Sequence, residues 1–255
     1  MVGLIGGTTC HIRLADGSHR ILDGMSAVPL AGHPTMFKPI AGAAPTVYDV
    51  ERRENQLGPK AVATPGSLLA WTQALRRYGT MSLSDVMQPA IKHATRGFTV
   101  TSYLSDCITD AASDLVQDPF AADRLVPDGT PLKAGEKLVQ ADYGEALQLI
   151  ARDGEGALHG GPLGDLLVEC MERSGAFIAK QDLTQYKVVE RQPIVGHYRG
   201  WEILGPPPPA VQVRDDVSDI VSDAGGDETG ETREVSLSAP KKGRGRPKGK
   251  KEISI

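Results

Sequence analysis

Hydrophobic residues recur at helical spacing through the middle of the chain. In SLLAWTQALRRYG, residues 67–79, the apolar positions fall on one helical face and Gly79 is suited to end the helix. A second helix is predicted over residues 82–98, because Ser82 followed by Asp85 is close to a capping box. Pro89 should either kink that helix or start a new segment. Further helices are predicted over residues 99–116, Asp142–Asp153 and Leu163–Ser174.

Strand-like runs flank this helical block. IRLADGSHRILDG, residues 12–24, has two such runs around an Ala-Asp-Gly turn, which predicts a hairpin. Residues 180–205 read as strands around a turn at His197–Gly200, whereas residues 41–60 read as a surface connection. The order of strands, helices and strands predicts an α+β fold.

The pattern ends after the four prolines at 206–209. Residues 211–240 are acidic and lack aromatic side chains, so they cannot bury enough apolar surface to offset the entropy of ordering. Residues 241–251 then hold seven Lys or Arg. We therefore expect three parts: a folded segment over 1–210, a disordered acidic linker over 211–240 and a basic tail over 241–255.

Composition narrows the possible functions. The net charge of −4 over 255 residues argues against nonspecific nucleic-acid binding by the molecule as a whole. Cys10, Cys107 and Cys170 are widely spaced and the six histidines stand singly, so neither a disulfide framework, a metal site nor a cofactor is predicted. The N-terminus lacks the features of a signal peptide and no run is long enough for a membrane helix, which favours an intracellular protein.

Three sequence segments, in this order along the chain, resemble a known family. They are GLIGGTTCHIRLADGSHRILDGMSAVP, VATPGSLLAWTQALRRYGTMSLSDVMQPAIKHATRGFTVT and GGPLGDLLVECMERSGAFIAKQDLTQYKVVERQPIVGHYRGWEILGPPPPA. Residues 1–210 resemble the large subunit of the γ-glutamyltransferase family, also called γ-glutamyltranspeptidase or glutathione hydrolase. The resemblance implies part of an Ntn-hydrolase fold, in which two stacked sheets lie between helical layers.

The resemblance also implies a chemistry. Family members cleave themselves, and the new N-terminal Thr of the small subunit is the nucleophile, with its own α-amine as the base. The implied reaction is amide hydrolysis or acyl transfer on γ-glutamyl, glutathione-type or other acyl substrates.

The sequence departs from the family at both ends of the matching segment. The match starts at a glycine-rich strand and stops at Ala210, and the later Thr229 and Thr232 lie in an acidic tract. We therefore expect no catalytic residue in this chain, no activity of the fragment alone, and a separate small-subunit-like chain as its partner.

Another departure concerns substrate recognition. After Asp23-Gly24 the family has an Arg that pairs with the α-carboxylate of the substrate, followed by Glu, and here these positions are Met25 and Ser26. Methionine cannot make the charge-assisted bonds that Arg makes to a carboxylate. This favours an acylase or amidase with another substrate.

Thr8-Thr9 superficially resembles the Thr-Thr start of a family small subunit. The DGM and ATPG phrases downstream place these residues in the large subunit instead, where the equivalent stretch is an ordinary strand. The strand interpretation is favoured over a nucleophile at Thr8.

The tail phrase APKKGRGRPKGKK resembles an AT-hook, with the core Arg244, Gly245, Arg246 and Pro247 flanked by Lys242 and Lys248. The narrow minor groove of A·T-rich DNA attracts inserted Arg, and the lysines would contact phosphates. The alternative function is therefore a non-enzymatic protein that binds A·T-rich DNA, and a basic tail of this kind also serves as a nuclear localisation signal or a solubilising end.

Overall fold

The computed structural model describes residues 3–42 and 48–207. The strands are β1 (Thr8–Arg13), β2 (His19–Gly24), β3 (Phe98–Thr99), β4 (Lys137–Leu138), β5 (Val189–Arg191), β6 (Ile194–Tyr198) and β7 (Trp201–Gly205). The α-helices are α1 (Ser67–Tyr78), α2 (Leu83–Arg96), α3 (Ser102–Asp110), α4 (Ala112–Leu115), α5 (Pro119–Leu125), α6 (Ala141–Asp153), α7 (Pro162–Arg173) and α8 (Lys180–Gln185). Short 3-10 turns are η1 (Glu51–Arg53), η2 (Pro59–Ala61), η3 (Pro127–Gly129) and η4 (Gly154–Ala157).

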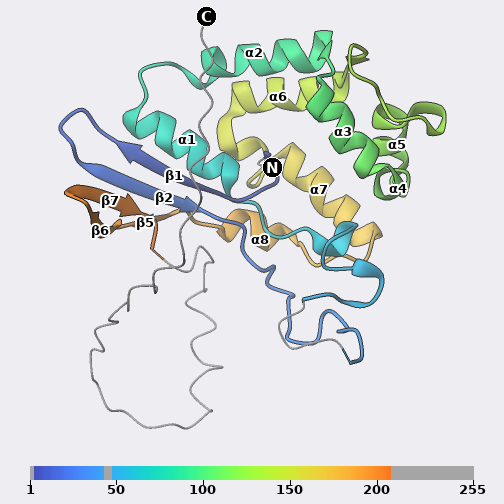
Figure 1. Cartoon of the computed structure of the whole chain (residues 1–255), viewed down its shortest axis with the longest axis horizontal. Coiled ribbons are helices and arrows are strands. Elements are labelled where there is room, and N and C mark those ends of the chain that lie inside the picture. Colours follow the sequence, from blue (N-terminus) through green and yellow to red (C-terminus); the bar gives the residue numbers. More distant parts are fainter. Residues whose placement is uncertain (1–2, 43–47, 208–255) are drawn as a thin grey trace, which may run out of the picture. The chain divides into compact units, whose positions relative to one another are not determined.

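Strands β1, β2 and β5 form an antiparallel sheet with β2 in the middle (Figure 1). Leu22 and Gly24 of β2 face α1, where Gly24 lies directly under Ala70, and Ile21 and Asp23 point to the opposite face. All four of these β2 residues are buried, so both faces of the central strand are covered.

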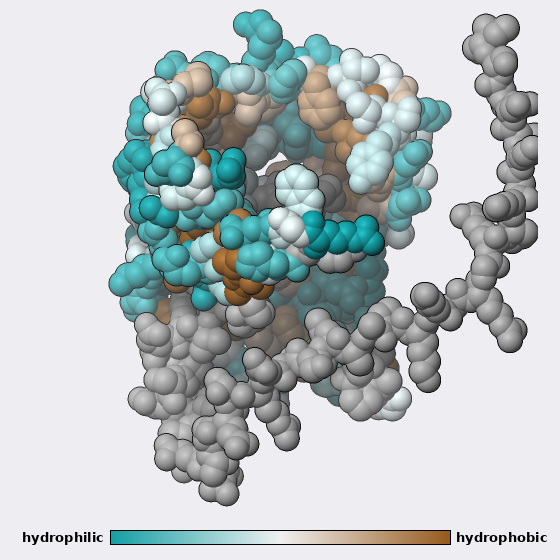
Figure 2. Space-filling model, turned by 60° about the vertical axis from the view of Figure 1, so that its left-hand side comes forward, coloured by the Kyte–Doolittle hydropathy of each residue, from teal (hydrophilic) through white to brown (hydrophobic). Residues whose placement is uncertain are grey.

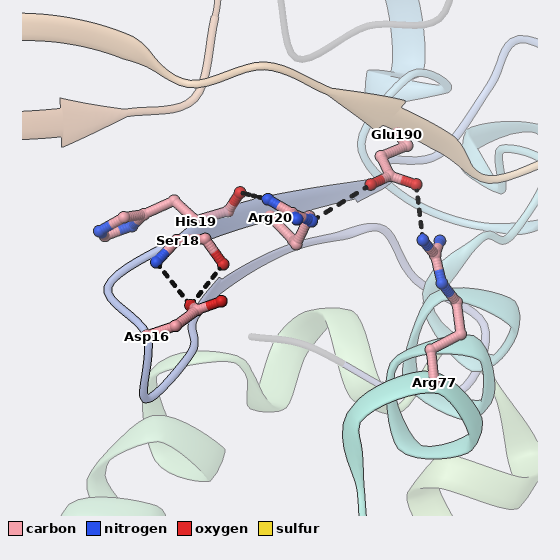
Figure 3. Close-up of polar contacts among 6 residues, drawn as sticks. All are labelled: Asp16, Ser18, His19, Arg20, Arg77 and Glu190. Carbon is pink, nitrogen blue, oxygen red and sulfur yellow. Dashed lines mark hydrogen bonds and ion pairs between the residues drawn. The ribbon is translucent and has the colours of Figure 1, made fainter.

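Charged side chains join α1 to this sheet (Figure 3). Glu190 of β5 accepts a 2.8 Å hydrogen bond from Nη2 of Arg77 on α1, and its other carboxylate oxygen lies 3.9 Å from Nε of Arg20 on β2. The bond to Glu190 raises the pKa of Arg77. Because these side chains are partly exposed, their ion pairs fix the orientation of α1 on the sheet more than they increase the free energy of unfolding.

The helical layer is built on paired helices α2 and α6. Ile91 and Ala94 of α2 pack against Leu147 of α6, and Gly144 lets the two helices approach, because a Cβ there would lie 2.5 Å from Thr95 Cγ2. A neighbouring core cluster joins α1 to the end of α6 and to the segment that follows; its buried members are Leu68, Ile150, Ala157 and Leu158. Another joins α7 to α8 and consists of Val168, Met171, Ile178 and Leu183.

Helix α2 begins as predicted, with the Ser82 hydroxyl accepting a 3.1 Å bond from the Asp85 amide. The expectation that Pro89 starts a new segment is wrong, because α2 continues through it to Arg96. The helix after Pro89 buries Ile91 and Ala94, and this packing favours one continuous helix.

The predictions differ from the structure in two further places. The helix expected over 99–116 divides into α3 and α4, because Ala111 has ψ 2° and leaves helical geometry. Residues 180–185, predicted as strand, form α8, because the buried Asp182 carboxylate accepts the Ala179 amide at 2.8 Å and caps the turn. The hairpin at β1–β2, the helices α1, α6 and α7 and the strands of residues 189–205 are confirmed.

Candidate functional site

The loop that contains Met25 lies against the glycine-rich start of the chain. We call residues 25–30, which follow β2, the Met25 loop. A Cβ on Gly7 would lie 2.9 Å from Ser26 Oγ and 3.0 Å from Met25 Cα, so only glycine allows this approach. The carbonyl of Gly6 accepts bonds of 3.0 Å from the amides of both Gly66 and Ser67. The N-terminal strand, the Met25 loop and the start of α1 therefore meet at one place.

Gly24 and Gly66 make the next close approach. A Cβ on Gly24 would lie 2.8 Å from the Gly66 carbonyl oxygen, and one on Gly66 would overlap the Tyr186 hydroxyl. The glycine of the ATPG phrase before α1 is therefore required by packing, because Gly66 leaves room for the Tyr186 hydroxyl to reach the loop.

The backbone of the Met25 loop is held by hydrogen bonds from several elements. The Met25 amide donates to Asp23 Oδ1 at 3.0 Å, and the Met25 carbonyl accepts from the Tyr186 hydroxyl at 2.6 Å. Ala27 and Thr64 exchange both backbone bonds, at 3.1 and 2.8 Å. The backbone of the loop is therefore held in place by residues from the rest of the chain.

Asp23 supports the loop from beneath. Its carboxylate is buried, and its Oδ2 accepts a bond of 2.5 Å from Nε of Arg191 on β5. This pairing compensates the buried charge. Burial raises the pKa of Tyr186 far above its ordinary value and the Asp23 charge adds to that effect, so Tyr186 remains a neutral hydrogen-bond donor.

Asp182 anchors the far end of the loop. It is fully buried, and its carboxylate accepts the Leu30 amide at 2.6 Å and the Ala179 amide at 2.8 Å, with the Thr64 hydroxyl at 3.5 Å. One carboxylate of α8 thereby joins the loop to the strand-like segment before α1.

His159 lies beside Tyr186, with ring centroids 6.2 Å apart. Burial lowers the pKa of His159, so its ring is neutral and Nδ1–H donates to the Leu183 carbonyl at 3.0 Å. Sequence reasoning did not identify His159, Asp182, Tyr186 or Arg191, because each acts through contacts with residues distant in the sequence.

Met25 and Ser26 are half-buried beside this scaffold. They offer a thioether and a hydroxyl, while the cation that contacts the loop's base, Arg191, is bound to Asp23. The arrangement suits an apolar or hydroxyl-bearing group better than a carboxylate.

Thr8 begins β1 and pairs with Gly24, which agrees with the strand interpretation. In residues 3–42 and 48–207, no three His, Cys, Asp or Glu side chains are grouped to hold a metal ion, and no helix is long and apolar enough to cross a membrane. The expectation that all histidines stand singly is wrong, because His11 and His19 are in contact.

The linker and tail predicted over 211–255 lie outside the described residues. They include the AT-hook positions Lys242, Arg244, Gly245, Arg246, Pro247 and Lys248. Contact with A·T-rich DNA, and a nuclear role for the tail, remain predictions.

Comparisons with known proteins agree with the resemblance. The sequence model of a family described as Gamma-glutamyltranspeptidase matches residues 1–212. The chain is 49% identical over 210 residues to the Acylase ACY 1 proenzyme of Pseudomonas sp. (strain V22), covering 82% of this chain and 38% of that protein. It is 32% identical over 206 residues to the Glutathione hydrolase proenzyme of Escherichia coli (strain K12), covering 80% of this chain and 34% of that protein.

A solved structure shows the same fold. The crystal structure of Helicobacter pylori gamma-glutamyltranspeptidase superposes with a TM-score of 0.74 at 28% identity, covering 80% of this chain and 57% of that one. The expectation of an α+β, Ntn-hydrolase fold is confirmed. The chain spans little more than a third of the length of these curated relatives.

Proposed function

Because the chain belongs to the gamma-glutamyltranspeptidase family, we propose that it forms the acyl-binding part of an amide-bond hydrolase or acyltransferase whose nucleophile is supplied by another polypeptide segment. The observation that carries the proposal is the Met25 loop, whose backbone is fixed by Asp23 and Tyr186. A preorganised loop at this position is the feature that an acyl-binding site requires.

The nucleophile would be an N-terminal threonine on the complementary segment. Its hydroxyl would attack the amide carbonyl carbon, its α-amine would take the hydroxyl proton, and that proton would leave with the departing amine. Water or an amine acceptor would then release the acyl group. The described chain would contribute binding and orientation to this reaction, and we expect it to be inactive alone.

The substrate we propose carries an acyl group without a carboxylate at the position of Met25. A carboxylate there would lose its water, and the cation at the base of the loop, Arg191, is already paired with Asp23. Higher identity to an acylase than to a glutathione hydrolase supports this choice.

The β6–β7 hairpin is the proposed docking surface for the complementary segment. Ile194, Trp201 and Ile203 lie on one face of the hairpin and are 53%, 75% and 55% exposed. These strands lie at the left of Figure 1 and turn toward the reader in Figure 2, where hydrophobic surface is exposed among hydrophilic side chains. An apolar face of this kind usually meets a partner.

The test combines the full chain with the part of the Acylase ACY 1 proenzyme that lies beyond the matched region. Turnover of an aliphatic acyl p-nitroanilide and of γ-glutamyl-p-nitroanilide would be compared with the full chain alone. We expect activity in the mixture, with kcat/KM at least tenfold higher for the aliphatic substrate. A preference for the γ-glutamyl substrate would contradict the proposed specificity.

Met25→Arg tests the proposed substrate preference by introducing a cation at position 25. It should move the ratio of kcat/KM toward the γ-glutamyl substrate by roughly tenfold or more, because an Arg–carboxylate pair would become available. Met25→Leu is the matched control and should leave the ratio nearly unchanged. An equal effect of both substitutions would show that position 25 acts only through packing.

A further inference from the structure

Two histidines meet across the β1–β2 hairpin, outside the proposed acyl site. Nε2 of His11 lies 3.1 Å from Nδ1 of His19, and the rings are tilted by 60° with centroids 5.2 Å apart. In the register, His11 pairs with Ile21 and His19 pairs with Arg13. The two histidines are therefore diagonal neighbours on one face of the sheet.

The turn between them is firmly built. Leu14 donates to the Ser18 carbonyl at 2.9 Å, and Gly17 has φ 84°, which glycine adopts readily. Asp16 Oδ1 accepts both the Ser18 amide, at 2.9 Å, and the Ser18 hydroxyl, at 2.7 Å (Figure 3). This turn holds the backbone positions of His11 and His19 close without any ligand.

The spacing of the two ring nitrogens matches that of two ligands on one metal ion. With metal–nitrogen bonds of about 2.0–2.1 Å, nitrogens at this separation subtend about 100° at the ion. That angle lies between the octahedral and tetrahedral values. We propose that His11 and His19 form a two-imidazole site for a divalent transition-metal ion such as Ni²⁺, Cu²⁺ or Zn²⁺, with water in the remaining positions.

Binding needs a change of tautomer and a rotation of both rings, because an ion at about 2.0–2.1 Å from each nitrogen lies off the line that joins the two hydrogen-bonded nitrogens. In the complex His11 would carry its proton on Nδ1 and His19 would carry its proton on Nε2, so that both ligands stay neutral. Imidazole is a preferred ligand of these ions, and Cu²⁺ should bind more tightly than Ni²⁺.

The neighbouring groups limit the affinity. Cys10 points to the opposite face from His11, and Oδ1 of Asp16 is held by the amide and the hydroxyl of Ser18. Arg13 lies directly across from His19 on the same face and adds a repelling charge. We therefore expect a weaker site than one with three or four protein ligands, and Arg13→Gln should tighten it.

The site would connect β1 to β2. Since Thr8 of β1 pairs with Gly24 at the base of the Met25 loop, an ion at the other end of the same hairpin would stabilise the strands that support that loop. The inference does not depend on the proposed function.

The test is calorimetric titration of the full chain with NiCl₂, followed by electron paramagnetic resonance of the Cu²⁺ complex. We expect one ion per chain, affinity reduced at least tenfold in His11→Gln and in His19→Gln, and coupling of Cu²⁺ to two imidazole nitrogens that falls to one in each variant. His33→Gln and His93→Gln are matched controls that should bind as the wild type does. Unchanged affinity in His11→Gln and His19→Gln, or no binding by the wild type, would overturn the proposal.

Circular dichroism shows whether a loss of metal binding in a variant comes from the lost ligand or from a loss of folded structure. Both histidine variants should keep the wild-type spectrum, because His11 is exposed and His19 is partly exposed. Arg13→Gln provides an independent check, since it should raise the affinity for Ni²⁺ while leaving both ligands in place. A fall in affinity in Arg13→Gln would count against the site.

Discussion

In the Met25 loop, buried side chains from distant parts of the chain satisfy the backbone, whereas the β6–β7 hairpin pairs its own backbone and leaves large apolar side chains in water. Asp182 reaches the loop from 152 residues away and Tyr186 from 161. The hairpin instead exposes Trp201 at 75% of its surface. The backbone of the loop is thus satisfied within the chain, whereas the hairpin keeps a large apolar surface exposed.

The strongest test of the loop is Asp182→Ala. It would leave the amides of Leu30 and Ala179 without the buried carboxylate that accepts from both, and a hydrogen bond to a charged group contributes about 1.5–3 kcal/mol. We expect the free energy of unfolding, measured with urea, to fall by about 3 kcal/mol or more. Asp165→Ala is the control, since Asp165 is an exposed partner of Lys180 and should cost less than about 1 kcal/mol. Similar losses in both variants would show that the bonds from Asp182 to the Met25 loop add no more stability than an exposed ion pair does.

Gly66→Ala should have the next largest effect. A methyl group there would collide with the Tyr186 hydroxyl and the Gly24 carbonyl, which are fixed on both sides. Overpacking of this kind costs about 1–3 kcal/mol. Gly156→Ala, where nothing lies within 4 Å of the added methyl, should have little effect. Thermal melts of the two variants would separate two effects of replacing glycine. One is steric overlap in the folded protein, which only Gly66→Ala should show, and the other is the lower conformational entropy of the unfolded chain, which both should show.

The sequence predicted the hairpin, the principal helices and the α+β class, because these follow from local periodicity. It also directed attention to position 25 through the family resemblance. It could not predict the support beneath that position, since QDLTQY appears strand-like until Asp182 is seen capping α8 and holding Leu30. Likewise, His11 and His19 looked isolated because their contact depends on strand register. Polar contacts between residues far apart in the sequence produce no periodic pattern from which they could be predicted.

Tyr186→Phe tests the hydrogen bond to Met25 with a smaller expected loss. Removing the hydroxyl should cost about 1 kcal/mol at pH 8. Burial raises the pKa of folded Tyr186 above the value of about 10 that applies to the unfolded chain. The folded state therefore keeps its proton where the unfolded state loses it, so this stability is complete below pH ~10 and is lost as the pH rises further.

The measurement is the difference in unfolding free energy between wild type and Tyr186→Phe at pH 8 and at pH 11. We expect the advantage of the wild type to shrink at the higher pH, and the comparison with Phe removes the contribution of every other titrating group. An advantage that grows with pH would mean that the hydroxyl is not held as a neutral donor.

The smallest effect on stability is expected in the hairpin, with the substitutions Trp201→Ser and Ile203→Ser. Because both side chains are more than half exposed, each change should alter the unfolding free energy by no more than about 0.5 kcal/mol. The same changes should weaken binding of the complementary segment at least tenfold, since a buried tryptophan commonly contributes about 2 kcal/mol or more at an interface. Phe120→Ser on α5 is the control, because Phe120 is 74% exposed but lies outside the hairpin. A large loss of stability in Trp201→Ser would show instead that the hairpin packs within its own chain, and the contrast with the Met25 loop would then disappear.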